Sequence, residues 1–221
     1  MNNEFTRRGL LRIPLSLASL ALASGVAARA GEKAEYVNTG LLYKPVTPGD
    51  MVLGKEDAPV TIVEYASATC PHCATFHEEQ WPVIKKEYVD TGKVRFIFRE
   101  FPLDQLAQAA FMLARCQPKE KYFPMIGLIM KNQRTWVKDP KNELLKLAKL
   151  AGMTQADFDA CLKNQKLANE VVGISKNASR DFGIDSVPTF FVNGRRVVGG
   201  RPIDEFRKII DEELKKATEK K

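Results

Sequence analysis

The stretch that decides the fold runs from residue 60 to residue 81, where a strand pattern meets a helix pattern at two closely spaced cysteines. Residues 60–66 read Val-Thr-Ile-Val-Glu-Tyr-Ala, an apolar and β-branched run that predicts a strand. Residues 70–73 read Cys-Pro-His-Cys, and residues 74–81 mix polar and apolar side chains at helical spacing. We therefore expect Cys70 at the first turn of a helix, where unpaired backbone N–H groups and the helix dipole stabilise a thiolate.

Three kinds of site compete for Cys70 and Cys73: a structural disulfide, half of a zinc site, and a redox-active dithiol. Zinc takes about four ligands, commonly Cys and His. The only histidines, His72 and His77, both lie beside the motif, and no second Cys-x-x-Cys exists. A bridge that closes so short a loop removes little chain entropy, which disfavours a purely structural role. We therefore favour the redox-active dithiol, with no metal and no bound cofactor.

A redox-active pair at this position is expected to be asymmetric. The helix start and a protonated His72 both lower the pKa of Cys70, and Pro71 suits the first helical turn because its missing N–H is not needed there. A stabilised thiolate makes the disulfide an oxidant. Cys73, deeper in the helix, is expected to be shielded and to act second. A substrate thiolate would attack Cys70, a mixed disulfide would form, and Cys73 would leave and stay reduced.

Working outward from the motif, strand patterns lie on both sides of a long helical stretch. Residues 103–182 carry several apolar runs at helical spacing, with no strand pattern among them. Asn193-Gly194 is a strong signal for a tight hairpin between two short strands. Strands are expected at residues 51–53, 60–66, 94–98, 188–192 and 195–198, and a last helix is opened by Pro202. An α/β or α+β fold with the motif at the carboxyl end of a strand fits this order.

Three residues near the motif carry local expectations of their own. Pro82 should kink the helix that follows the motif or end its first half. His77 lies one helical turn beyond Cys73, and a surface position is expected for it. Glu64 is an isolated acid in an apolar strand, and such an acid is usually solvated at an edge.

Residues 1–30 have the pattern of a secretory signal peptide. A basic start precedes an uncharged run, and Ala28-Arg29-Ala30 offers a small-x-small cleavage site. The uncharged run is short for a membrane span, and an uncleaved anchor is the alternative. Paired arginines near the start leave twin-arginine export open beside ordinary secretion. Residues 31–50 are polar and irregular, and we expect them to form an N-terminal arm.

Export into an oxidising compartment changes what the four cysteines mean. An even count there suggests disulfide bonds. Close spacing makes Cys70–Cys73 the simplest pair, and this leaves Cys116 with Cys161 in the helical block. A structural disulfide between Cys116 and Cys161 is favoured over two free thiols, which would behave as small buried apolar groups.

Two stretches far apart in the sequence together resemble a known family. They are Cys70-Pro71-His72-Cys73 and residues 186–194, which read Ser-Val-Pro-Thr-Phe-Phe-Val-Asn-Gly. With these two stretches, their separation and the helical block between them, the sequence resembles the thioredoxin superfamily. More narrowly, it resembles the bacterial periplasmic thiol:disulfide interchange proteins of the disulfide-bond-formation A (DsbA) type. The resemblance covers most of residues 51–218. It implies a thioredoxin fold from residues 51–102 and 183–221, with residues 103–182 inserted as an all-helical domain.

The resemblance also implies roles for individual residues. It implies that Pro188 is cis and faces the active-site disulfide, and that Val187, Pro188 and Thr189 bind an extended substrate strand. A plain trans proline that starts a strand is the alternative. The resemblance places Glu64 beneath the active site as a buried acid that assists proton movement at Cys73.

We therefore expect a periplasmic oxidoreductase that donates its Cys70–Cys73 disulfide to folding exported proteins. The resemblance implies reoxidation by a quinone-linked inner-membrane partner of the disulfide-bond-formation B (DsbB) type. One alternative is an isomerase or reductase kept reduced, although residues 31–50 hardly provide the dimerisation module usual for that role. Another is a thioredoxin-fold binding or chaperone-like protein with an incidental disulfide. The net charge of +7 comes without an arginine-rich helix or basic-aromatic stripe, so nucleic-acid binding is not expected. Stable membrane insertion is not expected either, because the uncharged run near the N-terminus is short for a span and has the pattern of a cleaved signal peptide.

Overall fold

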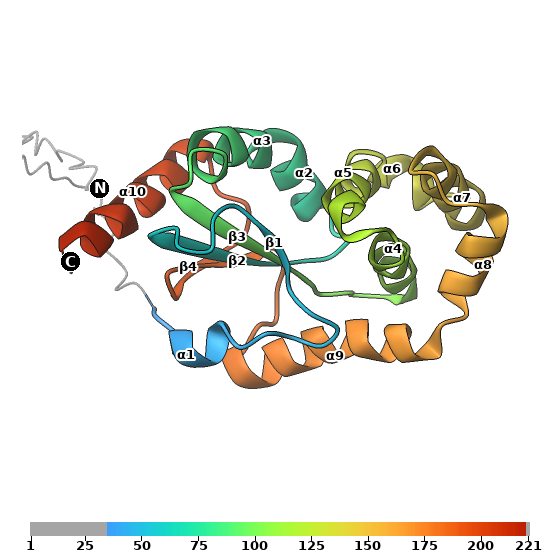
Figure 1. Ribbon diagram of the computed structural model, residues 1–221, viewed down its shortest axis with the longest axis horizontal. Coiled ribbons are helices and arrows are strands. Elements are labelled where there is room, and N and C mark those ends of the chain that lie inside the picture. The colour runs from blue at the N-terminus through green and yellow to red at the C-terminus, as the bar shows by residue number, and fades with distance from the viewer. Residues whose placement is uncertain (1–34, 220–221) are drawn as a thin grey trace, which may run out of the picture. The chain divides into compact units, whose positions relative to one another are not determined.

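A mixed β-sheet organises residues 35–219, the part of the chain that this computed structural model describes (Figure 1). The predicted signal peptide, residues 1–30, and the first residues of the predicted arm, 31–34, lie outside the described residues. The strand order in the sheet is β1-β3-β2-β4-β5. The strands are β1 (Met51–Leu53), β2 (Val60–Ala66), β3 (Val94–Glu100), β4 (Thr189–Val192) and β5 (Arg195–Val198).

Strand β2 is central because its side chains are apolar on both faces of the sheet. It pairs in parallel with β3, with Ile62 opposite Phe96, and antiparallel with β4, with Glu64 opposite Phe190. Every residue of β2 except Thr61 is buried. A strand covered on both faces reads as a continuous apolar run. The carboxyl end of β2 leads directly into the Cys-Pro-His-Cys motif.

Helices cover both faces of the sheet (Figure 1). On one face lie α2 (Pro71–Glu79), α3 (Trp81–Ile84), the π-helical turn η1 (Lys85–Val89) and α10 (Ile203–Glu219). On the other lie α1 (Thr39–Leu42) and α9 (Gln165–Phe182). Successive strand residues point to opposite faces, so Phe190 packs in the first apolar cluster and Phe191 in the second.

Proline and glycine set several helix boundaries, as the sequence predicts. The helix after the motif ends at Glu79, and α3 starts at Trp81 with Pro82 in its first turn. A proline further along a continuous helix would remove a backbone hydrogen bond and clash with the preceding turn. Gly183 ends α9 in the left-handed conformation, with φ of 60°.

The chain between β3 and β4 contains only helices. They are α4 (Gln105–Arg115), the 3₁₀ turn η2 (Lys119–Lys121), α5 (Tyr122–Lys131), α6 (Gln133–Trp136), α7 (Pro140–Leu150), α8 (Gln155–Leu162) and α9. A capping box forms at Thr154 and Asp157 and starts α8. The C-terminal part of α9 packs on the sheet through Ile174 and Phe182, so α9 belongs to both parts of the fold. The division into a helical domain at 103–182 and a thioredoxin-fold domain stays a prediction.

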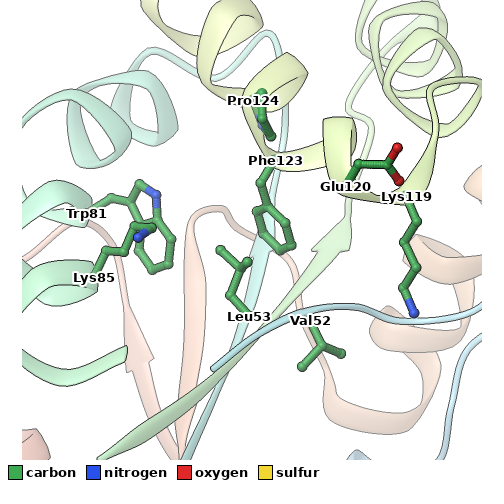
Figure 2. A pocket seen from close by; sticks show the side chains of 8 residues that line it. All are labelled: Val52, Leu53, Trp81, Lys85, Lys119, Glu120, Phe123 and Pro124. Atoms are coloured by element: carbon green, nitrogen blue, oxygen red, sulfur yellow. The ribbon is translucent and has the colours of Figure 1, made fainter. Parts of the chain in front are cut away.

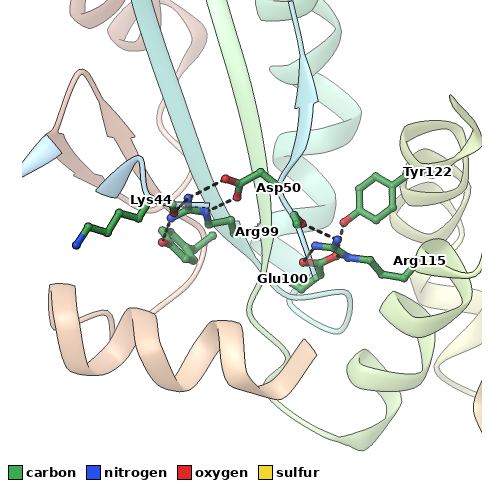
Figure 3. A network of polar contacts seen from close by, with 8 residues as sticks. Lys44, Asp50, Arg99, Glu100, Arg115 and Tyr122 are labelled. Carbon is green, nitrogen blue, oxygen red and sulfur yellow. Dashed lines mark hydrogen bonds and ion pairs between the residues drawn. The ribbon is translucent and has the colours of Figure 1, made fainter. Parts of the chain in front are cut away.

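A buried ionic network joins the helical block to the sheet (Figure 3). Glu100, at the end of β3, accepts hydrogen bonds from Arg115 Nε at 2.5 Å and Nη2 at 2.7 Å, and from the Tyr122 hydroxyl at 2.6 Å. The preceding residue, Arg99, points to the opposite face and donates to Asp50 at 2.8 Å. Buried charges are tolerated when they are paired in this way. The paired charges extend β3 two residues beyond its predicted end.

The predicted N-terminal arm is more ordered than the sequence indicates. Asn38 caps the short helix α1, and Leu42 is fully buried against the sheet. Tyr36 forms an isolated bridge with Arg195 of β5. The expectation of an irregular arm is therefore wrong for residues 36–43, because one apolar side chain and one strand bridge fix them to the fold. Within residues 35–219, no helix has the length and apolar character needed to cross a membrane.

Candidate active site

The Cys-Pro-His-Cys motif lies where β2 gives way to α2. Cys70 is the N-cap residue of α2 and has an extended backbone, and Pro71 is the first helical residue. This is the predicted placement, because proline is preorganised for the first helical position. Both thiols are reduced in this structure. Cys70 is 6% exposed and Cys73 is 0% exposed, so only Cys70 has a surface toward solvent.

The two thiols have opposite electrostatic character. The thiol of Cys73 donates a hydrogen bond that lowers the pKa of Cys70 to about 6, and the backbone N–H groups of Cys73 and His72 add to this effect. The His72 charge contributes least, and burial opposes the change. Burial raises the pKa of Cys73 far above its ordinary value, and the Cys70 thiolate reinforces this. The Ser67 N–H donates to Cys73 Sγ at 3.4 Å. The Cys70 thiol is thus ionised much more readily than the Cys73 thiol.

The predicted substrate wall lies directly against Cys70. The Val187-Pro188 peptide bond is cis. Cys70 Sγ donates to the Val187 carbonyl at 3.4 Å across 117 positions of sequence. Thr189 is 1% exposed and its hydroxyl donates to the Ser186 carbonyl at 2.7 Å, so Thr189 supports this turn from behind. Val187 is half-buried and offers the accessible part of the wall.

Glu64 and His77 form a buried pair beneath the motif. Glu64 is 0% exposed, so it is not a solvated edge residue. The expected surface position of His77 is wrong, because the residue is only 8% exposed and its Nε2 lies 3.1 Å from both carboxylate oxygens of Glu64. The rings of Phe98 and Trp81 pack around the imidazole, at 5.7 Å and 6.2 Å between centroids. The four-residue spacing from the buried Cys73 was the sequence signal for this position.

Sequence reasoning missed Gln133, which holds the motif loop in place. Its side-chain amide donates to the Ala68 carbonyl at 2.7 Å and the Cys70 carbonyl at 2.9 Å. Gln133 belongs to α6 in the helical block and is 4% exposed. No local pattern marks it, because its partners are backbone groups more than sixty positions away.

The second pair of cysteines lies apart from the motif. Cys116, at the end of α4, is joined to Cys161 of α8 by a disulfide bond with a Cα–Cα distance of 6.1 Å. The bond therefore crosslinks two helices of the helical block.

An open pocket of about 580 Å³ lies between β1, α3 and the start of α5 (Figure 2). The side chains of Leu53, Trp81 and Phe123 form its apolar lining, and neither Cys70 nor Cys73 lines it. Within residues 35–219, no group of three or more His, Cys, Asp or Glu side chains is arranged to hold a metal ion.

Comparison with known proteins identifies the family. A family model described as thioredoxin matches residues 46–212. The chain belongs to the thioredoxin family. Within this family, the solved structure of alpha-DsbA1 from Wolbachia pipientis is similar with a TM-score of 0.77 and 32% identity, over 83% of this chain and 99% of that one. Oxidised BdbD from Bacillus subtilis is similar with a TM-score of 0.69 and 25% identity, over 83% and 100%.

Curated relatives of this thioredoxin-family chain carry related names. A putative protein-disulfide oxidoreductase of Rickettsia conorii is 34% identical over 79% of this chain, which spans 64% of that relative's length. Disulfide bond formation protein D of Bacillus subtilis is 28% identical over 83% of this chain and 85% of the relative. The predicted thioredoxin fold and the predicted resemblance to DsbA-type proteins are confirmed.

Proposed function

We propose that this chain is a thiol-disulfide oxidoreductase that donates its Cys70–Cys73 disulfide to cysteines of exported proteins as they fold. The opposite shifts of the two thiol pKa values carry this proposal. A thiolate that is stable at neutral pH favours the reduced form of the pair, and this makes the disulfide a strong oxidant.

The reaction proceeds in two thiol–disulfide exchange steps. A substrate thiolate attacks Cys70 Sγ, the Cys70–Cys73 bond breaks, and its electron pair goes to Cys73 Sγ, which takes a proton. A second substrate thiolate then attacks the substrate sulfur of the mixed disulfide and releases Cys70 as a thiolate. Hydrogen bonds from the Cys73 thiol and from the backbone N–H groups of Cys73 and His72 stabilise that thiolate, and the His72 charge adds the smallest contribution. Pro71 starts the helix that directs these N–H groups, and Glu64 assists the proton movement at Cys73.

Binding of the substrate is assigned to the turn that faces Cys70. An extended substrate strand would lie along Val187 and Pro188, with Thr189 supporting the turn. The Val187 carbonyl already lies within hydrogen-bond distance of Cys70 Sγ, which brings a bound strand to the reactive sulfur. We assign the Cys116–Cys161 disulfide a structural role in the helical block.

The location and the reoxidising partner are part of the same proposal. The signal-peptide pattern of residues 1–30 and the Cys116–Cys161 disulfide both suit the periplasm, since disulfides persist in oxidising compartments. A spent dithiol needs an electron acceptor, and we assign that role to a quinone-linked inner-membrane protein of the DsbB type. The substrates that we propose for the present chain are exported proteins with free cysteines.

A redox titration in glutathione buffers tests the proposal. A disulfide donor should have a potential near the value of about −120 mV that is typical of strong oxidants. A potential near the thioredoxin value of about −270 mV would indicate a reductase instead. Failure of the wild-type chain to exchange with glutathione at all would indicate a binding protein. The matched control is the Cys70→Ser variant, which cannot form the disulfide.

A further inference from the structure

Three buried titratable residues lie beneath the motif: Cys73, Glu64 and His77. Cys73 and Glu64 are each 0% exposed, whereas the His77 side chain is 4% exposed. Cys73 and His77 lie four residues apart on α2, so they share the face of the helix that meets the sheet. The negative charge of Glu64, on β2, opposes ionisation of the Cys73 thiol.

We propose that His77 is a positioning residue that connects Glu64 to solvent and thereby lets the Cys73 sulfur gain and lose its proton. This inference rests on the proposed function, because it concerns how the inner cysteine of the reacting pair changes its protonation.

The need for such a connection follows from burial. Each time the Cys70–Cys73 bond opens, Cys73 Sγ receives an electron pair in a place that no water reaches. A buried anion without a partner is costly, so a proton must arrive with the charge. Glu64 is the carboxyl group whose charge acts on Cys73, but it has no exposed surface of its own. His77 Nε2 lies within hydrogen-bond distance of both Glu64 carboxylate oxygens. Among Cys73, Glu64 and His77, it is the His77 side chain that has an exposed part.

The proton step balances without any added reactant. When the disulfide opens, Cys73 Sγ takes a proton from the Glu64–His77 pair, and solvent returns one proton to the pair through the imidazole. When the disulfide re-forms, the pair accepts the Cys73 proton. The resulting thiolate attacks Cys70 Sγ in a mixed disulfide, and the departing thiolate takes the electron pair.

The surroundings of the pair supply few competing titratable groups. From α2 the facing group is Cys73, and from α3 and β3 the neighbours are the aromatic rings of Trp81 and Phe98. From α5 the facing group is Tyr122, whose pKa burial raises well above its ordinary value and whose hydroxyl is bonded to Glu100. Glu100 in turn is paired with Arg115. Glu64 and His77 are therefore the groups that exchange a proton with Cys73.

Trp81 gives this pair a defined neighbour at the surface. Its ring packs beside His77 on one side and points into the pocket of Figure 2 on the other. The imidazole thus lies one side chain away from an open pocket.

Ring closure of a mixed disulfide tests the inference directly. The reduced full chain is mixed with oxidised glutathione, the reaction is quenched at intervals, and the glutathionylated form is counted by mass spectrometry across a range of pH. Attack by Cys70 depends on glutathione concentration, whereas attack by Cys73 on the mixed disulfide does not. The variants are His77→Gln, which keeps a hydrogen-bond donor, His77→Leu, Glu64→Gln, and the double variant Glu64→Gln/His77→Gln. Phe76→Leu is the control for a packing change on the same helix.

Both His77 variants should slow ring closure by about tenfold or more, as expected for loss of a proton-transfer group. They should also remove one inflection from its pH profile, while attack by Cys70 changes by less than about twofold. In the Glu64→Gln background, His77→Gln should add no further loss. Phe76→Leu should lower the unfolding temperature and leave the profile unchanged.

Two results would overturn the inference: a His77→Gln profile that superimposes on the wild type, or losses from Glu64→Gln and His77→Gln that simply add. If the wild-type chain showed neither phase of exchange, the proposed function itself would fail. Should the variants not fold, imidazole NMR signals of wild-type His77 still decide the matter. They should change between the disulfide and dithiol forms at constant pH, and identical signals would contradict the relay.

Discussion

Replacing Cys73 by alanine tests what lowers the pKa of Cys70 from its ordinary value of 9.0 to about 6. The Cys73 thiol is the largest cause. A hydrogen bond to a charged group contributes about 1.5–3 kcal/mol, and about 1.36 kcal/mol corresponds to one pKa unit. Cys73→Ala should therefore raise the Cys70 pKa by about 1 to 2. The backbone N–H groups of residues 72 and 73 remain, so the pKa stays below 9.0.

Two matched variants sharpen this prediction. Cys73→Ser keeps a donating hydroxyl at the same position, and the Cys70 pKa should stay close to 6. His72→Gln removes only the imidazole charge, which is the smallest of the causes, so the pKa should rise by less than about 1.

The rate of alkylation by iodoacetamide, followed against pH, reports the fraction of Cys70 present as thiolate. Absorbance of the thiolate in the near ultraviolet is an independent measure on the same samples. A larger increase in the Cys70 pKa for His72→Gln than for Cys73→Ala would refute the reasoning, because the imidazole would then dominate over the neighbouring thiol.

Three further predictions concern stability. The lowered Cys70 pKa stabilises the folded dithiol form fully above about pH 9, and this stabilisation is lost as pH falls through about 6. The reduced form should therefore have a higher unfolding temperature than the oxidised form at pH 8, but not at pH 5. A difference in unfolding temperature that does not depend on pH would contradict this. Arg115→Ala leaves Glu100 buried without its cationic partner and should cost about 3–5 kcal/mol in urea unfolding, whereas the exposed Lys146→Ala should cause no resolvable loss. Equal losses would argue against the network. Gln133→Leu removes two hydrogen bonds to the motif loop, of about 1 kcal/mol each, and should speed amide exchange there; unchanged exchange would argue against its role.

Much of the fold could be predicted because its signals are local. The central strand has the predicted bounds, residues 60–66, since a strand covered on both faces is mostly apolar, here with Thr61 and Glu64 as its polar members. The hairpin at Asn193-Gly194 forms because both residues adopt positive φ, at 47° and 85°. Strand β3 runs two residues past its predicted end because Arg99 and Glu100 are polar in sequence, and only distant partners allow them to be buried.

The candidate site was predictable only in part, for the same physical reason. The motif cysteines and Pro188 could be connected because two separate stretches of sequence resemble one family. His77 could not be placed, since its burial depends on Glu64 and on aromatic rings from other elements. The order of the causes that lower the Cys70 pKa was also hidden, because the hydrogen bond from Cys73 depends on side-chain geometry.

The bridge between Tyr36 and Arg195 has a consequence for the border of the sheet. Strand β5 lies at the border of the sheet, and an open border is a template on which extended chains add and aggregate. Here the Val37 N–H donates to the Gly194 carbonyl at 2.9 Å, and the Arg196 N–H donates to the Glu35 carbonyl at 2.8 Å. The arm thus occupies this border with the chain's own backbone, and β5 offers no open edge there to another extended chain.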